Sequence, residues 1–324
     1  MTKNYRWGII GPGRIAEKFC TAIQFTEGSE VYAVASRNKE NAHAFAGKFN
    51  AAKAYDNYEA LMQDENVDVI YIATPHPFHH DQTIACLKHK KAVVCEKPLS
   101  LRYSDTKEMI DVAKENNVFL MEGLWTASMP FMQKILSLIK DDVIGTLQYI
   151  SADFGFAAPA DLSGRLYNRA LGGGATLDVG IYPLYLATAI LGHPSVIKSV
   201  SKLAVTGVDE YSNTVLQYDS GATAHLVCSI GFNTPVEAEI VGTKGSIKIK
   251  NPWFKATDFS LHINNGTTED FSIPHLSNGF EHEVKEVMHC LDNGLLQSNK
   301  VPHSLTLSLS KTMDEILRQA GVEY

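Results

Sequence analysis

Apolar positions in the first third of the chain follow two alternating spacings. Continuous apolar runs rich in β-branched residues predict strands at residues 5–10, 31–36, 67–74, 92–96 and 118–121. Between these runs, apolar residues recur every three or four positions, which predicts helices after residue 14 and at 42–49, 80–89 and 104–114. Strands that alternate with helices pair in parallel, so the pattern predicts an α/β fold, a doubly wound parallel sheet of the Rossmann type. A TIM barrel would need eight strand–helix units, and the alternation stops near residue 122.

The pattern changes after residue 122. A helix at 130–140 and a strand at 147–156 come first, and a glycine-rich segment then opens a helix at 181–191. Short strands joined by hairpin turns follow, and apolar stripes predict two final helices. The predicted strands cover 196–206, 211–218, 222–230, 237–241, 246–250, 259–263 and 270–273. We therefore expect a Rossmann domain at 1–122 and an α+β domain at 123–324 with a large open, mostly antiparallel sheet. For the final helix, packing back on the first domain is an alternative.

Composition excludes several classes of partner. The chain has 324 residues, 45% of them hydrophobic, and its net charge of −7 leaves no basic surplus for nucleic acid. No apolar run approaches the length that spans a bilayer, so we expect no membrane partner. The five cysteines are scattered and form no CxxC pair, which favours reduced thiols in the cytoplasm and no metal site.

A glycine-rich turn follows the first predicted strand, in the sequence GPGRIA from Gly11 to Ala16. Gly11 allows the tight turn, Gly13 lets the backbone approach a pyrophosphate, and Ala16 is small enough for close helix–strand packing. The helix start supplies amide donors and a positive dipole. The position of this turn between a strand and an amphipathic helix predicts a dinucleotide site.

The end of the second predicted strand distinguishes between the two dinucleotides. NAD sites place an acidic residue there for the ribose 2′-hydroxyl, whereas this chain has Ser36 and Arg37. A hydroxyl and a guanidinium suit a 2′-phosphate, so we favour NADP over NAD. The alternative is that Arg37 is a solvated residue at a helix start.

Two further loops end predicted strands and should face the cofactor. The first runs from Thr74 to His80 and includes three histidines; without acidic partners or ligand spacing they do not predict a metal site, and His79 is placed at the border of the substrate pocket. The second is Glu96-Lys97-Pro98, where an ammonium at the cofactor would hydrogen-bond a substrate hydroxyl and lower the pKa of a nearby phenol. The alternative for Lys97 is an exposed lysine after a strand, and an X–Pro bond at Pro98 tolerates the cis geometry.

Asp178 and Tyr182 lie four residues apart, after three consecutive glycines, and share one face of the predicted helix. The carboxylate can orient substrate hydroxyls, and the phenol can act as an acid or base if a cation lowers its pKa. Taken alone, the pair would be an ordinary acidic helix start beside a packed tyrosine.

These motifs together resemble the Gfo/Idh/MocA (glucose–fructose oxidoreductase / inositol dehydrogenase) family, and within it the dimeric dihydrodiol dehydrogenases and NADP-dependent sugar dehydrogenases. The resemblance rests on GPGRIA, Glu96-Lys97-Pro98 and GGGATLDVGIY, and it runs to the final helix. It implies Lys97 as the family lysine and Asp178 as its aspartate. Tyr182 stands where many members have a histidine, a departure that the dihydrodiol dehydrogenase branch shares.

The resemblance also implies a substrate pocket and a homodimer. The catalytic residues are expected to be Lys97, Tyr182 and Asp178, and the substrate pocket Trp125, Phe154, Asp178, Tyr182, Trp253 and Phe280. For Trp253 and Phe280, a place in the ordinary aromatic core is an equally favoured alternative. The residues expected at the cofactor are Gly11, Gly13, Arg14, Ile15, Ser36, Arg37, Thr74, Pro75, His79, Glu96 and Lys97. One face of the strand at 222–230 is apolar and the other has no charged residue, so a second subunit is expected to cover the uncharged face.

The expected function is hydride transfer between NADP and a carbinol or carbonyl carbon of a cyclic polyol, either a sugar or a trans-dihydrodiol. Two other functions stay open. A ligand-responsive regulator would keep the cofactor fold but would not need Lys97 beside an acid/base pair. A redox-assisted glycosidase is less favoured because the chain shows no added pair of acid/base carboxylates.

Overall fold

The structure is a computed structural model that describes residues 4–159 and 161–324, and the chain divides into two compact units. Unit 1 contains the described part of Met1–Ser100, together with Ser104–Ser128 and His275–His303. Unit 2 contains Leu101–Tyr103, Met129–Pro274 and Ser304–Tyr324.

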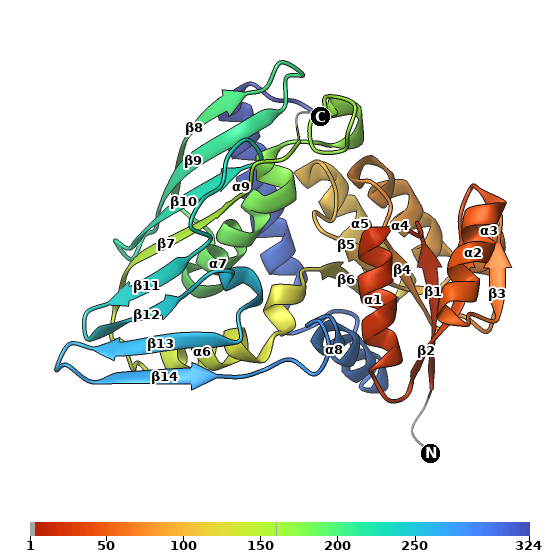
Figure 1. Ribbon diagram of the computed structural model, residues 1–324, viewed down its shortest axis with the longest axis horizontal. Coiled ribbons are helices and arrows are strands. Elements are labelled where there is room, and N and C mark those ends of the chain that lie inside the picture. The colour runs from red at the N-terminus through yellow and green to blue at the C-terminus, as the bar shows by residue number, and fades with distance from the viewer. Residues whose placement is uncertain (1–3, 160) are drawn as a thin grey trace. The chain divides into compact units, whose positions relative to one another are not determined.

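Unit 1 has a six-stranded, fully parallel sheet in the order β3-β2-β1-β4-β5-β6 (Figure 1). Its strands are β1 (Tyr5–Ile10), β2 (Ser29–Ala35), β3 (Lys53–Tyr55), β4 (Val69–Ile72), β5 (Ala92–Glu96) and β6 (Leu120–Gly123). This is the strand order of the doubly wound dinucleotide-binding fold, in which the connections diverge on the two sides of β1 and β4. The predicted Rossmann sheet is therefore confirmed.

Helices connect these strands on both faces of the sheet. They are α1 (Arg14–Gln24), α2 (Lys39–Phe49), α3 (Tyr58–Gln63), α4 (His79–Lys88) and α5 (Tyr103–Asn116), with short helices η1 (His76–Phe78) and η2 (Trp125–Ser128). Helix α8 (Glu281–Asp292) is added to unit 1 by a later segment of the chain. The side chain of Asn38 caps α2 by accepting a 2.8 Å hydrogen bond from the amide of Asn41. The sequence pattern did not predict β3 and α3, because neither is long enough to show a periodicity.

Unit 2 has an eight-stranded sheet in the order β14-β13-β12-β11-β7-β10-β9-β8 (Figure 1). All neighbouring strands are antiparallel except β7 and β10, which run in parallel. The strands are β7 (Leu147–Gly155), β8 (Val196–Leu203), β9 (Asp209–Gln217), β10 (Thr223–Ser229), β11 (Ala238–Gly242), β12 (Gly245–Ile249), β13 (Asp258–Ile263) and β14 (Thr268–Ser272). The large, mostly antiparallel sheet is thus confirmed.

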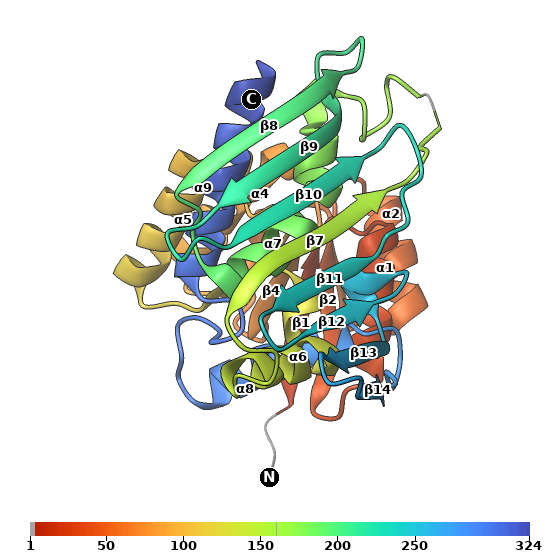
Figure 2. The same cartoon turned by 90° about the vertical axis from the view of Figure 1, so that its left-hand side faces the viewer.

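Helices of unit 2 cover one face of this sheet. They are α6 (Pro130–Lys140), α7 (Ile181–Leu191) and α9 (His303–Ala320), with the short segments η3 (Arg169–Leu171), η4 (Thr176–Gly180, a π-helix) and η5 (Trp253–Lys255). Figure 2 shows α7 and α9 behind the sheet. Ala224 and Leu226 of β10 are buried on the helix side, as their alternation predicts, whereas Thr223, His225 and Val227 on the other side are only half-buried.

One segment differs from the expectation that no apolar run reaches membrane-spanning length. Arg169–Leu191 is long and apolar enough to cross a membrane, but 83% of its most apolar stretch is buried inside the fold. This burial is typical of a core helix, and it explains why α7 is apolar on all sides.

The two units differ in extent from the expected ranges 1–122 and 123–324. Unit 1 continues to Ser128 and includes α8, whereas the final helix α9 belongs, apart from its first residue, to unit 2. Helix α8 packs against α1 and η2. A helical stripe in the sequence shows which face is buried but not which core receives it, so the sequence could not assign α8. All five cysteines are buried and free, and the cytoplasmic location inferred from their spacing stays a prediction.

Candidate functional site

The glycine turn lies where the connections of the unit 1 sheet diverge. Gly11 follows β1 and has a φ of +85°, a conformation that L side chains rarely adopt. A Cβ at this position would lie 2.8 Å from the backbone nitrogen of Thr74, the second residue after β4. The two loops therefore pack directly on each other, at the place where doubly wound folds bind their ligands.

The start of α1 is open to an anion. Gly13 is the N-cap of this helix and makes no side-chain cap, and a Cβ on Gly13 would meet no described atom closer than 4.0 Å. Packing within the protein does not require a glycine here, whereas close approach of a phosphate to the backbone does. Arg14 is exposed and Ile15 half-buried in the first turn, and Ala16 is fully buried, as expected for the small residue of the motif.

Ser36 and Arg37 follow β2 in an open position. Arg37 is exposed, and its guanidinium carbon lies 5.3 Å from the centre of the Phe78 ring in η1. The hydroxyl of Ser36 accepts a 3.2 Å hydrogen bond from the amide of Asn38. A guanidinium fixed over an aromatic ring beside the glycine turn can receive a 2′-phosphate, and no carboxylate occupies positions 35–38.

His79 joins the loop after β4 to the loop after β5. Its ring nitrogens lie 2.8 Å from the carbonyl oxygen of Thr74 and 2.9 Å from that of Pro98, and the side chain is fully buried. Burial lowers the pKa of His79, although both carbonyl groups act to raise it. Because both ring nitrogens face backbone carbonyl oxygens, His79 positions the two loops. Pro75, the residue after Thr74, is the N-cap residue of η1.

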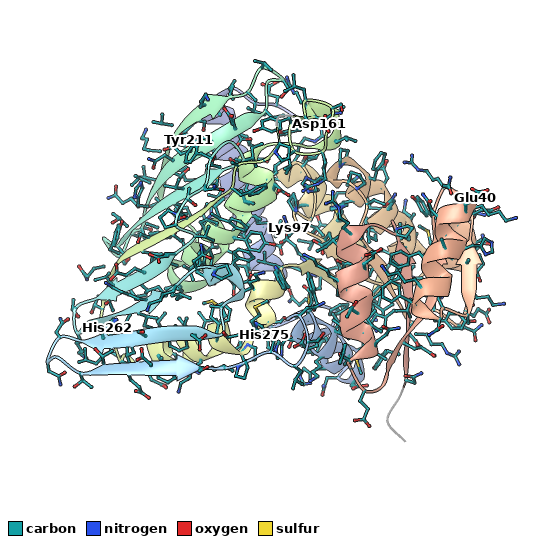
Figure 3. The ribbon with its side chains drawn as sticks, viewed as in Figure 1. Glu40, Lys97, Asp161, Tyr211, His262 and His275 are labelled. Carbon is teal, nitrogen blue, oxygen red and sulfur yellow. The ribbon has the colours of Figure 1, made fainter. Side chains whose placement is uncertain are left out.

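The buried carboxylate of Glu96 fixes the Glu96-Lys97-Pro98 loop through hydrogen bonds. Glu96 accepts hydrogen bonds from the hydroxyl of Tyr71 and, at 3.2 Å, from the amide of Lys97. The Lys97–Pro98 peptide bond is cis, the geometry that the sequence allowed. Lys97, labelled in Figure 3, is half-buried and follows directly on β5.

Asp178 lies in the π-helix η4 and faces a cation that sequence reasoning missed. Its Oδ1 accepts a 2.7 Å hydrogen bond from Nη1 of Arg165, in the loop after β7. The start of η4 is fixed by Asp209, whose carboxylate accepts hydrogen bonds of 2.7 and 2.6 Å from the amide and hydroxyl of Thr176; burial raises the pKa of Asp209 to about 6. A side chain at Gly174, with its φ of +114°, would collide with that carboxylate, which explains the glycine before η4.

Tyr182 stands against an aromatic wall within unit 2. Its ring centre lies 5.4 Å from that of Phe154 and 5.2 Å from that of Phe254, and these two phenylalanines stack at 4.2 Å. Trp253, the expected pocket residue, is fully buried and donates a 2.8 Å hydrogen bond to the carbonyl oxygen of Asp153. Phe254, which the sequence analysis did not select, thus lies beside Tyr182, while its neighbour Trp253 supports the strand behind.

The remaining expected pocket residues form a pair within unit 1. The rings of Trp125 and Phe280 stack at 4.3 Å with an interplanar angle of 13°, and Phe280 also meets the edge of Phe19. Phe280 ends the segment that enters α8, and Trp125 begins η2. Their stacking explains why α8 belongs to unit 1.

Each unit contributes different chemistry. Unit 1 offers a pyrophosphate turn, a guanidinium and the Lys97 ammonium; unit 2 offers a phenol and a carboxylate beside an aromatic wall. Arg165 and Phe254 were missed because Arg165 lies in a loop without a motif and Phe254 has no periodic signal. The sequence signal that could have led to Arg165 and Phe254 is the resemblance of Asp178 and Tyr182 to the family's site residues, because these two are their neighbours in the structure.

Comparison with known proteins identifies the family. Residues 5–124 match the oxidoreductase family with an NAD-binding Rossmann fold (GFO_IDH_MocA), and residues 132–248 match the GFO/IDH/MocA C-terminal domain. The chain is 36% identical over 331 residues to trans-1,2-dihydrobenzene-1,2-diol dehydrogenase of Mus musculus, with 98% of each chain covered. It is 33% identical over 334 residues to the Homo sapiens protein of that name, again with 98% of each covered.

Solved structures share the fold at low sequence identity. The aldose-aldose oxidoreductase of Caulobacter crescentus, complexed with glycerol, has a TM-score of 0.90 at 23% identity and 98% coverage of both chains. The 3-ketoreductase KijD10 of Actinomadura kijaniata, in complex with TDP-benzene and NADP, has a TM-score of 0.83 at 23% identity and 97% coverage of both. With the matched family domains and the dehydrogenase relatives, these likenesses show that the chain belongs to the Gfo/Idh/MocA family and is an oxidoreductase with an NAD(P)-binding Rossmann fold.

Proposed function

We propose that the protein is an NADP-dependent dehydrogenase that moves a hydride between the nicotinamide and a carbinol or carbonyl carbon of a cyclic polyol, either a sugar or a trans-dihydrodiol. The observation that carries this proposal is the arrangement around Tyr182. A buried phenol lies against two stacked phenylalanines, one turn along the chain from a carboxylate that is itself held by Arg165. The aromatic wall suits an apolar ring face, and the carboxylate suits hydroxyl groups. The names of the mouse and human relatives favour the dihydrodiol.

The preference for NADP is supported by the residues at the end of β2. Open space at Gly13 and the exposed amide end of α1 fit a pyrophosphate, and Arg37 over the Phe78 ring fits a 2′-phosphate. A carboxylate at this position would repel the 2′-phosphate, and none is present. The NADP bound in KijD10 belongs to a relative of the same fold.

The side chains of the protein have distinct roles in the proposed reaction. When bound, the nicotinamide supplies or accepts the hydride. Tyr182 moves the proton of the substrate hydroxyl, Lys97 stabilises the phenolate by its charge and binds the same oxygen, and Asp178 orients the neighbouring hydroxyl. Arg165 positions Asp178, and His79 positions the loop that carries Lys97.

A ligand-responsive regulator of the same fold is the alternative, and catalysis distinguishes the two. The test is the change in NADPH absorbance with the purified protein, NADP and a panel of aldoses, inositols and trans-dihydrodiols. We expect turnover with at least one member, and a larger thermal stabilisation by NADPH than by NADH. Stabilisation by a sugar or diol without turnover by any member would favour the regulator.

The uncovered face of the unit 2 sheet supports a homodimer. Among the described residues, no helix of unit 2 lies over this face (Figure 2), and Val200 and Val215 are 74% and 46% exposed on it. Register places Val200, Asn213 and Val227 in one row across β8, β9 and β10; these three residues are uncharged, and the row continues on β7 at Asp153. An uncharged stretch of this kind is typical of an interface core. Light scattering should give the mass of two chains, and Val200→Lys should reduce it to one; a monomer at all concentrations would exclude the dimer.

A further inference from the structure

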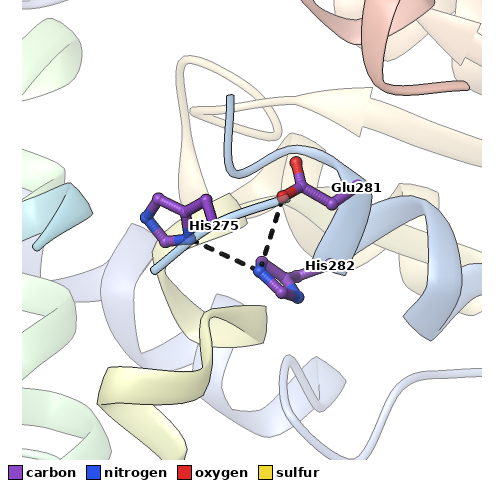
Figure 4. Close-up of side chains that lie close together, drawn as sticks. All are labelled: His275, Glu281 and His282. Carbon is purple, nitrogen blue, oxygen red and sulfur yellow. Dashed lines mark hydrogen bonds and ion pairs between the residues drawn. The ribbon is translucent and has the colours of Figure 1, made fainter. Parts of the chain in front are cut away.

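Three side chains of unit 1 bring metal-binding atoms together at the start of α8 (Figure 4). Nδ1 of His275 lies 3.4 Å from Nε2 of His282, and Nε2 of His282 lies 3.6 Å from Oε1 of Glu281. All the ligand atoms of this cluster lie within 4.8 Å of one another. The residues are separated from the phosphate-binding turn and from Lys97 along the chain, and no part of the proposed reaction uses them.

The spacing fits a metal ion better than a hydrogen bond between the two rings. Hydrogen bonds from N–H groups are usually about 2.7–3.2 Å long, so the 3.4 Å between the ring nitrogens is long for direct donation. Zinc holds histidine nitrogens at about 2.0–2.1 Å in a tetrahedron, which sets neighbouring ligand atoms about 3.3 Å apart. The two measured separations are close to that edge and need only small side-chain movements to reach it.

Glu281 is a preorganised ligand. Its side chain is fully buried, and Oε1 accepts hydrogen bonds of 2.9 Å from the amides of both Leu276 and Ser277, while Oε2 accepts one of 2.7 Å from Gly279. These bonds fix the carboxylate and fold the segment 276–280 around it. A ligand held by its surroundings loses little freedom on binding, which favours metal affinity.

The imidazole of His282 is suited to coordination as well. Its Nε2 lies between the other two side chains, 3.4 Å from Nδ1 of His275 and 3.6 Å from Oε1 of Glu281. His275 and His282 are both half-buried, so an ion has access to the cluster from solvent.

We propose that Nδ1 of His275, Nε2 of His282 and the carboxylate of Glu281, which keeps one lone pair free beside its three amide hydrogen bonds, bind one zinc ion, with water in the fourth position. The sequence analysis expected no metal because no cysteine pair or familiar histidine spacing is present; this site instead arises from the tight turn before α8. The ion would tie His275 to the helix and so close the segment that ends in Phe280, which stacks on Trp125. This proposal is independent of the proposed function, because the ligands belong to unit 1 alone and none of them is assigned to the substrate or cofactor.

Binding of zinc to the chelator-treated, dialysed protein tests the proposal. His275→Gln and His282→Gln each remove one ligand, and His289→Gln is the matched control, because His289 lies two turns further along the same helix and is exposed. We expect one zinc per chain in calorimetry for the unaltered protein and for His289→Gln. We expect affinity to fall at least about tenfold in each of the other variants. Circular dichroism establishes that each variant is folded.

Cobalt and diffraction give independent readings. Cobalt bound to the unaltered protein should show the strong visible bands of a tetrahedral site, and these should be absent from His282→Gln. Crystals soaked in zinc should give an anomalous peak between the three side chains, a result that needs no variant. The proposal is overturned if the unaltered protein binds no zinc, if all four proteins bind it equally, or if the peak lies elsewhere.

Discussion

Nη1 of Arg165 donates a hydrogen bond of 2.7 Å to Oδ1 of Asp178 within unit 2. The arginine side chain is 45% exposed, whereas that of the aspartate is only 9% exposed. The loop after β7 thus supplies a cation from the surface to a buried carboxylate in a π-helix. Loops move more easily than helices, and Arg165 lies in a loop. Arg165 can therefore orient Asp178 without being part of the hydrophobic core.

Replacement of Arg165 by Gln should impair turnover without affecting the cofactor. We expect kcat/KM for the active substrate to fall about 10- to 100-fold, because Asp178 loses the partner that orients it. The Kd for NADPH should stay unchanged, whereas the unfolding temperature should fall modestly, because the buried carboxylate of Asp178 loses an ion-pair partner. Arg169→Gln is the control, because Arg169 lies in the same loop region but donates to the carbonyl oxygen of Glu323. Equal kinetic losses in both variants would contradict the assignment.

Arg37→Gln should weaken NADP binding selectively. The variant keeps a polar side chain but loses the charge that a 2′-phosphate requires, so fluorescence titration should show an increase of about 10- to 100-fold in the Kd for NADPH. The Kd for NADH should change little. Arg6→Gln is a matched control, because the guanidinium carbon of Arg6 also lies 5.3 Å from an aromatic ring, that of Tyr32. Tighter binding of NADH than of NADPH by the unaltered protein would refute the preference.

The sequence predicted the fold where periodicity extends over many residues. The parallel order of unit 1 follows from buried β-branched runs such as Val69–Ile72, and hairpin turns predict the antiparallel sheet of unit 2. The short elements β3 and α3 gave no signal. The sequence shows that α8 has an apolar face but not which unit that face packs against. The Trp125–Phe280 stack places α8 in unit 1, and it joins residues 155 positions apart.

The site was predictable only where chemistry is local in sequence. Gly11 and Gly13 share one turn, and their roles follow from backbone geometry. Arg165 and Phe254, by contrast, reach Asp178 and Tyr182 from other parts of the chain, so only three-dimensional contacts identify them. His79 was placed at the border of the pocket, but one of its carbonyl partners, Pro98, lies 19 residues away, so only the fold shows its positioning role.

Two glutamates on α8 should affect stability in opposite directions with pH. Glu283 is fully buried, and neither of its oxygens has a hydrogen-bond partner among the described residues; burial, and then the charge of Glu96, raises its pKa well above 4.5. Its folded form therefore holds a proton that the unfolded chain releases, so its contribution to stability falls as pH rises above 4.5. Burial acts to raise the pKa of Glu286 too, but hydrogen bonds from Lys300 and Ser298 hold it below the usual value, so its contribution is present above pH 4.5 and is lost in acid.

Glu283→Met should stabilise the protein, and Glu286→Met should destabilise it. At pH 7.5 we expect about 1–3 kcal/mol in each direction, because one variant removes an unsatisfied polar group and the other leaves the Lys300 ammonium unpaired. The Glu283→Met difference should shrink as pH falls from 7.5 to 4.5, whereas the Glu286→Met difference should persist down to pH 4.5 and shrink only below it. Thermal unfolding at a series of pH values measures them. Destabilisation of Glu283→Met at every pH would show that its carboxyl group has a favourable partner.

Lys97 and Tyr182 should act as a unit in the proposed reaction. The phenol is a useful base only if a cation stabilises its ionised form, and the cation alone cannot accept the proton. Lys97→Met and Tyr182→Phe should therefore each lower kcat by about 10²–10⁴. Tyr185→Phe is the control, because Tyr185 is a buried tyrosine one turn further along α7 and burial raises the pKa of its hydroxyl.

The double variant distinguishes joint action from two separate roles. If both side chains serve one proton transfer, Lys97→Met combined with Tyr182→Phe should be little slower than either variant alone, because the step is already lost. NADPH should still bind to Tyr182→Phe, since the hydroxyl is assigned to the substrate. Multiplied losses in the double variant would mean that the residues act in separate steps. Full activity of Tyr182→Phe would remove the phenol from the mechanism, and His79 could not simply replace it, because both of its ring nitrogens already face the carbonyl oxygens of Thr74 and Pro98.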